Sequence, residues 1–340
     1  MRTLSPDSIL QTGLAFWGSK ALLSAVELGL FTVLAEGPQD GEQVRQRLGL
    51  HPRAVPDFLD TLLALGFLER EGSGRHAVYR NTPETQAFLD RRSPDYVGGI
   101  LEMANARLYP FWGGLTEALR TGRPQNETKD GGEPMFAKLY EDPARLEQFM
   151  GAMSGISAAN FRRLAERLDF TRHRTLADIG GATGQLACIV AERHPHLRCT
   201  TLDLPAVTAI ARRHVERRGL APRVSAQPID FFADPFPRAD VITMGMILHD
   251  WNLEKKLVLM RKAYDALPEG GCLVAIDHLI DDERRHNDFG LLMSLNMLIE
   301  FGDAFDYSGA DFAQWAHSIG FSRTEVIPLT ERAGAAVAYK

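Results

Sequence analysis

Two segments of the chain carry residues whose types and spacing favour chemistry on a small molecule. Residues 176–187 run from an apolar stretch through an acid and several small residues into a helical pattern. Residues 241–248 form an apolar, β-branched stretch that ends on His249. In an open parallel α/β sheet, ligands bind beyond the carboxyl ends of the strands. The polar ends of these two stretches therefore predict a nucleoside-bearing cofactor beside a histidine base.

The turn in the first segment argues against a dinucleotide. A dinucleotide fingerprint has the pattern G-x-G-x-x-G, whereas counting from Gly180 puts Ala182 third and Gln185 sixth. The sequence has no G-x-x-x-x-G-K-[ST] pattern, which excludes a P-loop. An acid before the turn suits a ligand with positive charge or with hydroxyl and amine donors. The alternative is a tight turn that binds nothing. The turn residues expected at the cofactor are Asp178, Gly180, Gly181 and Gly184.

Two further acids follow in the order that a nucleoside site requires. Residues 198–202 form a second apolar stretch that ends at Asp203. This acid lies close to the roughly 20 positions beyond the turn at which a carboxylate reaches a ribose in βαβ folds. One carboxylate can accept hydrogen bonds from both ribose hydroxyls. Asp230 and Phe231 come next, and such a pair can accept from an adenine amine and pack against its ring. Alone, that pair would be weak support.

In this order the motifs resemble those of the dimeric class I S-adenosylmethionine-dependent O-methyltransferases of the caffeate, acetylserotonin and antibiotic-tailoring type. The matching segments are 178–184, 202–205, 230–232, 248–251 and 266–271. The resemblance implies a Rossmann-like α/β domain with a mostly parallel seven-stranded sheet and S-adenosyl-L-methionine as the cofactor, with S-adenosyl-L-homocysteine as the product. It implies that the glycine turn holds the methionine part, Asp203 and Leu204 the ribose, and Asp230 and Phe231 the adenine. His249 would be the base.

The chemistry of methyl transfer to oxygen also fits that histidine. A phenol titrates near pH ~10, so its proton must be removed near neutral pH, and histidine has an ordinary pKa of ~6.5. The ring must be held through its other nitrogen. Two candidates are Asp277, after the expected strand 272–276, and Asp306, in the turn before a helix that begins near Ala310. The family usually has glutamates at both places, so these shorter acids put the strength of the base in question. A structural histidine is the alternative.

Two helical segments carry candidate contacts to the methyl acceptor. By resemblance, Phe149, Met153 and Ser157 point into the site from a helix that follows the segment 136–143. Met293, Met297 and Phe301 repeat the four-residue spacing in a helix before Asp306 and would form the opposite wall of an apolar slot. Phe and Met at this spacing also suit an ordinary core, and that alternative stays open. Asp250, beside the histidine, completes the expected acceptor contacts.

Composition is consistent with a soluble enzyme of more than one domain. The chain has 340 residues, 45% of them hydrophobic and 24% charged, with a net charge of −6. That length predicts two domains, and the charge gives no support for binding nucleic acid or an acidic membrane. Three cysteines without a C-x-x-C pattern favour a reducing compartment and no metal. We expect a cytoplasmic protein without a membrane-spanning segment.

The first part of the chain reads as a helical and winged-helix domain that pairs two copies. Helices are expected at 9–17, 21–34, 41–48 and 53–65, followed by a two-stranded wing over 67–79. The fourth helix is apolar and acidic, unlike a DNA-recognition helix, and the long apolar faces of the first two predict a homodimer. A helical connector would follow, with its main helix at 96–119, and a polar loop over 122–132 that folds over the site or the partner. The expected divisions are a dimerisation domain (1–100), the connector (101–164) and a catalytic domain (165–340).

The sequence thus predicts an O-methyltransferase of a small, hydroxylated, aromatic secondary metabolite. Two alternatives stay open. One is a relative of the same fold that methylates nitrogen or carbon, or that binds the cofactor without transfer. The other is a winged-helix transcriptional regulator with a ligand-sensing domain.

Overall fold

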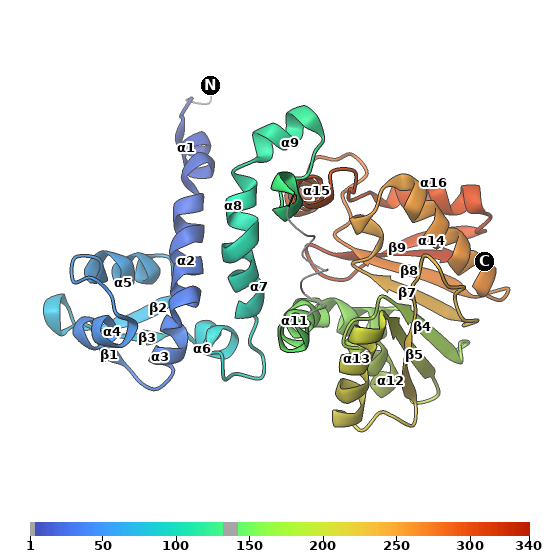
Figure 1. Cartoon of the computed structure of the whole chain (residues 1–340), viewed down its shortest axis with the longest axis horizontal. Coiled ribbons are helices and arrows are strands. Elements are labelled where there is room, and N and C mark those ends of the chain that lie inside the picture. Colours follow the sequence, from blue (N-terminus) through green and yellow to red (C-terminus); the bar gives the residue numbers. More distant parts are fainter. Residues whose placement is uncertain (1–3, 132–141) are drawn as a thin grey trace. The chain divides into compact units, whose positions relative to one another are not determined.

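The structure is a computed structural model that describes residues 4–131 and 142–340. The chain divides after Pro110 into two compact units, each with its own hydrophobic core (Figure 1). The connector expected at 101–164 is not a separate unit, because its first ten residues fall in the first unit and the remainder in the second.

The first unit has the expected helical and winged organisation. Its helices and strands are α1 (Asp7–Leu14), α2 (Phe16–Leu28), α3 (Leu30–Leu34), β1 (Gln39–Asp40), α4 (Gly41–Leu48), α5 (Val55–Ala64), β2 (Leu68–Glu71), the 3-10 turn η1 (Gly74–His76), β3 (Val78–Asn81) and α6 (Pro83–Leu89). The strands form an antiparallel sheet in the order β1-β3-β2. The expected helix 21–34 is interrupted at Gly29, whose φ of 74° ends α2 in the left-handed conformation that glycine adopts without cost.

The segment expected as one helix at 96–119 is broken into shorter pieces. They are α7 (Gly98–Met103), the π-helical turn η2 (Ala104–Leu108), α8 (Tyr109–Trp112) and α9 (Leu115–Thr121). The polar segment that follows includes the 3-10 turn η3 (Glu127–Asp130) and lies against the end of a later helix, since the amide of Gln125 donates to the carbonyl of Ile299 over 2.7 Å. The expected contact segment 136–143 lies largely outside the described residues.

A seven-stranded sheet organises the second unit. Its strands are β4 (Thr175–Ile179), β5 (Arg198–Asp203), β6 (Val224–Pro228), β7 (Val241–Gly245), β8 (Cys272–Asp277), β9 (Arg323–Pro328) and β10 (Gly334–Tyr339). They are ordered β6-β5-β4-β7-β8-β10-β9. Of these seven strands, β10 alone runs in the direction opposite to the other six. The chain goes from β4 to β5 on one side and returns to β7 on the other, so a crevice opens where β4 ends.

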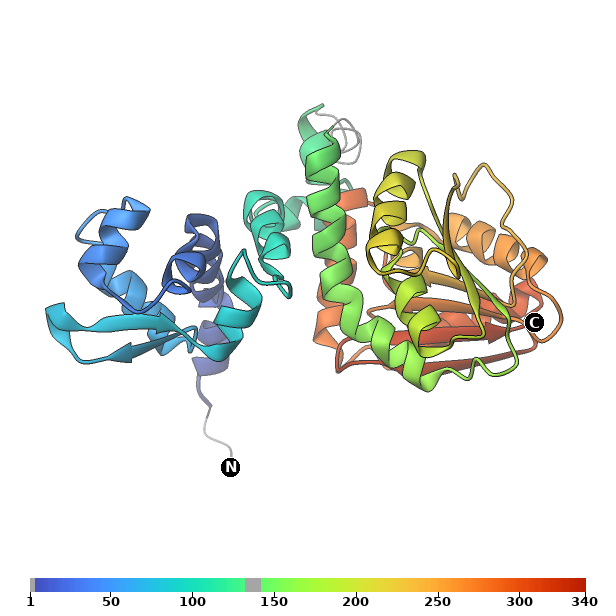
Figure 2. The same cartoon turned by 90° about the horizontal axis from the view of Figure 1, so that it is seen from below.

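Helices cover both faces of this sheet (Figures 1 and 2). The long α11 (Pro143–Arg167), α12 (Gln185–Arg193) and α13 (Pro205–Arg217) lie on one face. The other face is covered by α14 (Leu253–Ala266) and α16 (Gly309–Ile319), and α15 (Asp288–Phe301) contacts the turn that precedes α14. All six residues of β8 are buried, as expected for a strand covered on both faces.

Two helix starts fix the polar segments next to the site. Asn252 caps α14 by accepting from the amide of Lys255 over 3.0 Å, three residues after His249. Ser308 caps α16 in a reciprocal capping box with Asp311, two residues after Asp306. Among the described residues, none of the helices combines the length and the apolarity that a bilayer span requires.

Candidate active site

The glycine turn follows β4 at the crevice of the sheet. Gly180 and Gly184 have φ values of 68° and 74°, and the intervening Ala182 is also left-handed at 48°. A Cβ on Gly181 would overlap Oγ1 of Thr201, and one on Gly184 would lie 2.9 Å from Cγ2 of the same threonine. Small residues are therefore required here by backbone conformation and by close packing on β5. A non-glycine residue in the left-handed conformation is strained, and such strain is often found at functional sites.

Asp178 lies beneath this turn rather than at its surface. Its side chain is buried, and Oδ1 accepts from the hydroxyl of Thr243 on β7 over 2.7 Å. Oδ2 is buried without a hydrogen-bond partner and lies 2.6 Å from where a Cβ of Gly181 would be. Burial raises the pKa of this carboxyl to about 7. The acid that the sequence analysis set beside the ligand thus supports the turn from below.

Asp203 ends β5 and faces the turn across the crevice. One carboxylate oxygen accepts from the amide of Ala182 over 2.9 Å and the other from the amide of Leu204 over 2.8 Å. Burial raises the pKa of the carboxyl, against the two amide hydrogen bonds. Because each carboxylate oxygen has two lone pairs, both oxygens still have an acceptor position. Asp203 is thus held rigidly with the capacity that two ribose hydroxyls require.

Phe231 belongs to an aromatic cluster at the end of β6. Its ring centroid lies 5.0 Å from that of Phe232 and 6.1 Å from that of Trp251, in edge-to-face arrangements. Phe231 also lies 3.9 Å from where a Cβ of Gly180 would be. Asp230 is exposed, and its Oδ1 accepts from the amides of Phe232 and Ala233. The sequence analysis expected Asp230 and Phe231 at the adenine, whereas it gave the other two rings, which lie within its matched segments 230–232 and 248–251, no role.

Helix α11 packs against the turn. The hydroxyls of Ser154 and Thr183 are 2.7 Å apart in a buried contact that sequence reasoning did not anticipate. Phe149 of the helix and Ala182 of the turn both pack against a small apolar cluster formed by α11 and α13. Met153 and Ser157 are half-buried one and two helical turns further along. The structure therefore brings this helix beside the cofactor turn and leaves the roles of its three expected contact residues as predictions.

His249 lies in a 3-10 turn and not at the end of a strand. The expected strand 241–248 stops at Gly245, because Met246 takes a φ of 57° and turns the chain. The amide of Met246 donates to the carbonyl of Ile276 over 2.9 Å, which holds the start of the turn on β8. Residues Leu248–Asp250 then form the 3-10 turn η4. The prediction of a continuous strand to residue 248 was wrong. His249 nevertheless lies at the edge of the sheet where the sequence analysis expected it.

Of the two acids expected to hold the histidine, only Asp306 is within ion-pair distance of it. Nδ1 of His249 lies 3.4 Å from Oδ1 of Asp306, and both side chains are buried. Nε2 lies 3.2 Å from Oδ1 of Asp250, which is 29% exposed. Asp277 instead accepts a hydrogen bond from the hydroxyl of Tyr307. The end of β8 is near the ring, but Tyr307 takes the carboxylate that the sequence analysis assigned to His249.

The surrounding carboxylates control the charge of His249. Burial alone lowers the pKa of this histidine, but Asp250, Asp306 and Asp277 oppose burial and raise the pKa to about 10. Burial raises the pKa of the Asp277 carboxyl to about 7 and also raises that of Asp250. The neighbouring carboxyl groups therefore favour the protonated ring near neutral pH in the ligand-free site.

Helix α15 provides the apolar wall expected beside this turn. It lies against η4, and the hydroxyl oxygen of its Ser294 accepts from the amide of Asp306 over 3.2 Å. Met297 is buried and Met293 half-buried, whereas Phe301, at the last turn, is 37% exposed. The structure thus places the methionines on a helix beside His249. Their contact with an acceptor stays a prediction.

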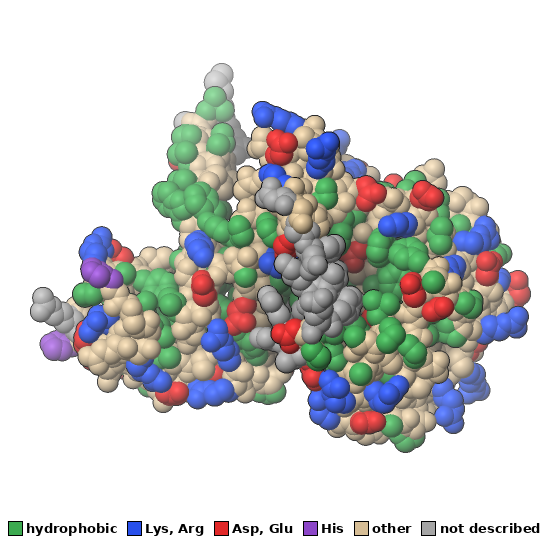
Figure 3. Space-filling view, in the orientation of Figure 1, with side chains coloured by type: hydrophobic (Ala, Val, Ile, Leu, Met, Phe, Trp, Pro, Cys, Tyr) green, Lys and Arg blue, Asp and Glu red, His purple; other side chains and the backbone are tan. Residues whose placement is uncertain are grey.

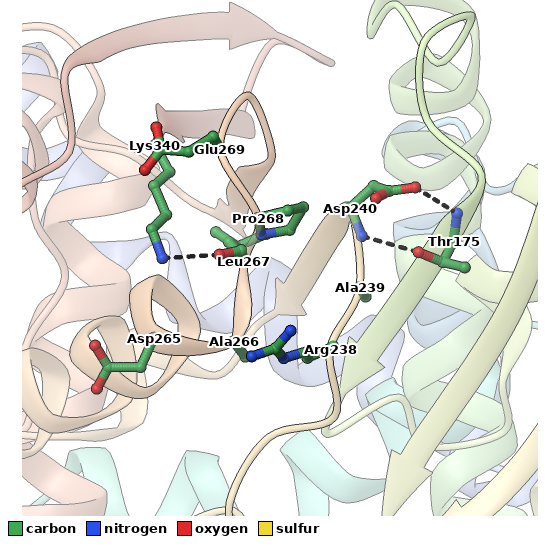
Figure 4. A pocket seen from close by; sticks show the side chains of 10 residues that line it. All are labelled: Thr175, Arg238, Ala239, Asp240, Asp265, Ala266, Leu267, Pro268, Glu269 and Lys340. Carbon is green, nitrogen blue, oxygen red and sulfur yellow. Dashed lines mark hydrogen bonds between the residues drawn. The ribbon is translucent and has the colours of Figure 1, made fainter.

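A cavity lies at the opposite edge of the sheet from the glycine turn. It measures about 390 Å³ and is found where β4 and β7 begin (Figure 4). Its polar groups serve the fold: Asp240 accepts from the amides of Arg174 and Thr175, and Lys340 donates to the carbonyls of Tyr264 and Leu267. Because ligands of such sheets bind at the carboxyl ends of strands, we assign no role to this cavity.

Comparison with known proteins assigns the family. Residues 112–322 match the O-methyltransferase domain family, and residues 10–91 match the O-methyltransferase dimerisation domain. The chain belongs to this O-methyltransferase family. The enzyme class, the two-part organisation and S-adenosylmethionine as the cofactor follow from that membership and agree with the sequence analysis. Membership favours the enzyme over the transcriptional regulator considered as an alternative.

Three known proteins similar to this chain differ in the reactions that their names give. It is 43% identical to the tetracenomycin polyketide synthesis 8-O-methyl transferase TcmO of Streptomyces glaucescens, over 93% of this chain and 91% of that protein. It is 39% identical to the N,N-dimethyltransferase OxyT of Streptomyces rimosus, over 92% and 90%. The crystal structure of human N-acetylserotonin methyltransferase in complex with SAM has a TM-score of 0.90 and 28% identity, covering 100% of this chain and 98% of that one.

The residues of this chain fit the cofactor of the family. Gly180, Gly181 and Gly184 of the turn leave no room for a side chain, and Asp203 beside them keeps acceptor positions where the ribose is expected. Asp230 and the aromatic cluster lie at the end of the next strand, where an adenine ring would follow the ribose. When bound, S-adenosylmethionine supplies a methyl group already activated on a sulfonium.

Proposed function

We propose that this O-methyltransferase acts on an aromatic hydroxyl of a small metabolite, with His249 as the proton acceptor and Asp306 as the group that holds its ring. The arrangement around the histidine carries this proposal. A buried carboxylate lies at Nδ1, while Nε2 faces the half-exposed Asp250. One nitrogen thus faces a buried carboxyl group inside the protein, and the other lies on the side from which an acceptor can approach.

Removal of the acceptor proton requires a change in charge at His249. An imidazolium cannot accept a proton, and its pKa of about 10 in the ligand-free site makes the neutral ring a minor species near neutral pH. Positive charge beside His249, such as a sulfonium would bring, would lower that pKa, because like charges disfavour the protonated ring. Asp250 is also placed to bind the acceptor hydroxyl and to compensate for the charge that develops on the ring.

The apolar helix α15 supports an aromatic acceptor. Met293 and Met297 lie beside the catalytic turn on a helix whose composition is mostly apolar. Methionine side chains pack well on ring faces and edges. TcmO, by its name, acts in the synthesis of a polyketide, which agrees with a hydroxylated ring system of some size.

N-methylation is the second candidate, because OxyT is named an N,N-dimethyltransferase and is 39% identical to this chain. The two candidates differ in their need for a base. A neutral arylamine has its lone pair available and loses its proton after transfer, whereas a phenol must lose it before or during transfer. The family domain and the buried His249–Asp306 pair favour oxygen.

We also propose that two copies of the chain pair through the first unit. Apolar side chains gather over α1 and the start of α2 (Figure 3). Ile9 is 74% and Trp17 is 62% exposed, an extent of exposed apolar surface that marks a partner interface. The dimerisation domain match supports this pairing. A cytoplasmic location and the lack of a nucleic-acid or membrane partner stay predictions from the sequence.

Transfer of a labelled methyl group tests the acceptor and the base together. The wild type is assayed with 1-naphthol, a hydroxynaphthoic acid and a hydroxyanthraquinone, each beside the matching arylamine. We expect label on oxygen, a decrease in kcat of about 10²–10⁴ in His249→Gln, and unchanged binding of S-adenosylhomocysteine. His317→Gln, at an exposed position on α16, is the matched control. Wild-type turnover in folded His249→Gln would show that this histidine is structural, and label on nitrogen alone would establish the second candidate.

A further inference from the structure

A lysine is buried inside the catalytic domain. Lys256 lies on α14 and is fully buried, together with Leu259, Met260 and Ala263 on the same face of the helix. Lysine is almost never fully buried without a specific partner. Lys256 lies in the apolar face of the helix, three and four residues before the next buried positions. A specific partner for its charge is therefore expected.

The ammonium of Lys256 binds two backbone carbonyls from separate segments. Nζ donates to the carbonyl of Trp251 and to the carbonyl of Phe305, the latter over 2.8 Å. It also lies 3.8 Å from the ring centroid of Phe305 and 5.8 Å from that of Tyr307. These contacts replace the water that the buried charge has lost.

The two carbonyls belong to the segments that hold the histidine pair. Trp251 directly follows the turn η4 that carries His249, and Phe305 directly precedes Asp306. We propose that Lys256 is a positioning residue that ties these two segments together and thereby sets the contact between His249 and Asp306. The proposal rests on the function proposed above for that pair.

The charge of Lys256 acts on the same cluster. Burial lowers the pKa of its ammonium to about 8, against the attraction of nearby carboxylates, so the group is charged near neutral pH. Several ionisable groups surround Lys256 and His249. They are Asp250 in η4, Asp277 and His278 at the end of β8, Glu300 near the end of α15, and Asp303, Asp306 and Tyr307 after α15. Because Lys256 loses its proton near pH 8, below the pKa of about 10 of His249, its removal acts on the His249 titration through the position of Asp306. A weaker contact with that carboxylate lowers the pKa of His249.

A second lysine of α14 provides an internal comparison. Nζ of Lys262 donates to the carbonyls of Phe231 and Phe232 over 2.6 and 2.9 Å. The contacts are of the same type, but they hold the aromatic segment expected at the adenine. Removing Lys262 should therefore weaken cofactor binding without moving the titration of His249, the reverse of what is expected for Lys256.

The experiment compares Lys256→Met, Lys256→Gln and Lys262→Met in the full chain. Arg261→Met serves as a surface control, because Arg261 is an exposed residue on the same helix. Calorimetry with S-adenosylhomocysteine measures the cofactor site. NMR of ¹³C-labelled histidine in that complex follows the titration of His249, whose signal is identified by its absence in His249→Gln. Methyl transfer to the aromatic hydroxyl probes gives kcat and its pH profile.

For Lys256→Met we expect unchanged S-adenosylhomocysteine affinity, a His249 titration moved to lower pH because the contact with Asp306 is weakened, and a kcat lower by on the order of 10- to 100-fold, as for a misplaced catalytic group. Lys256→Gln removes the charge but keeps donors. It should show the same direction of titration shift with a smaller loss of kcat, and it decides the question if the methionine variant does not fold. Arg261→Met should match the wild type.

Wild-type kcat and His249 titration in a folded Lys256 variant would overturn the proposal. So would an equal loss of kcat and of cofactor affinity, since that indicates a general structural role. If the wild type methylates none of the hydroxyl probes, the proposed function fails. The His249 titration still tests Lys256, because it needs no acceptor.

Discussion

Replacing Asp306 by asparagine should expose how much the charge of His249 depends on one carboxylate. The substitution keeps the size of the side chain, and the site is buried, so the main change is the loss of a negative charge. Asp265→Asn is a matched control, because Asp265 is exposed on α14 and lines the cavity at the opposite edge of the sheet.

The size of the effect follows from the separation of the two groups. Unit charges at the 3.4 Å between Nδ1 and Oδ1 attract by about 5 kcal/mol at an effective dielectric constant of about 20. This is an upper bound, since both groups also lose hydration. Opposite charges at such distances shift a pKa by about 1 to 3 pH units in folded proteins. We therefore expect His249 of Asp306→Asn to titrate about 1 to 3 pH units below its pKa of about 10 in the parent protein.

Turnover should nevertheless decrease. The asparagine amide can donate to Nδ1, which leaves the ring proton on Nε2, the nitrogen that must accept from the substrate. The expected loss in kcat is about 10²–10⁴, as for loss of a general base. NMR titration of labelled histidine and a pH profile of methyl transfer measure the two effects. An unchanged His249 titration in a folded variant would refute the assignment of Asp306 as its partner.

Four further predictions concern the cofactor site, the fold and the dimer. Asp203→Asn should weaken S-adenosylhomocysteine binding by ~1–3 kcal/mol in calorimetry, through the loss of hydrogen bonds to a charged acceptor. Because folding raises the pKa of Asp178 from 3.8 to about 7, its contribution to stability is full below pH ~4 and is lost as the pH rises through 7. As the pH rises over that range, the free energy of unfolding of Asp178→Asn should therefore increase relative to that of the wild type, by up to about 4 kcal/mol. Thermal unfolding of the free protein measures this difference. The NMR pKa of His249 should be lower with a cationic cofactor analogue than with S-adenosylhomocysteine, and equal values would show that the sulfonium does not act on this ring. Trp17→Glu should give monomers in light scattering, and an intact dimer would place the interface elsewhere.

The order of the cofactor motifs was readable from the sequence because it depends on local patterns. The small residues at 180–184, the acid at the end of β5 and the acid–aromatic pair after β6 each follow a strand that its apolar run reveals. The structure places all of them at the same edge of one sheet. The wing of the first unit was equally clear, since Gly72 and Gly74 separate two short β stretches.

The partners within the catalytic turn could not be read in the same way. Met246 gives no sign in the sequence that it takes a left-handed conformation, so the strand was extended past Gly245. Tyr307 lies 30 residues after Asp277, and no spacing rule connects them. Lys256 did leave a signal, because it occupies the apolar face of an otherwise regular amphipathic helix. A charged residue in such a position is a reason to look for a buried polar partner.

The two aspartates that stand where the family usually has glutamates, Asp277 and Asp306, contact different groups. The resemblance to the family led us to expect both carboxylates at the histidine, but Asp306 alone lies at Nδ1, while Asp277 holds the hydroxyl of Tyr307. Tyr307 is the residue after Asp306, and its ring lies 5.8 Å from the ammonium of Lys256. Asp277 therefore holds the segment of Asp306 from β8, and Lys256 holds the same segment from α14. In this arrangement the environment of Nδ1 depends on one carboxylate, Asp306, and on two buried contacts that fix the segment carrying Asp306.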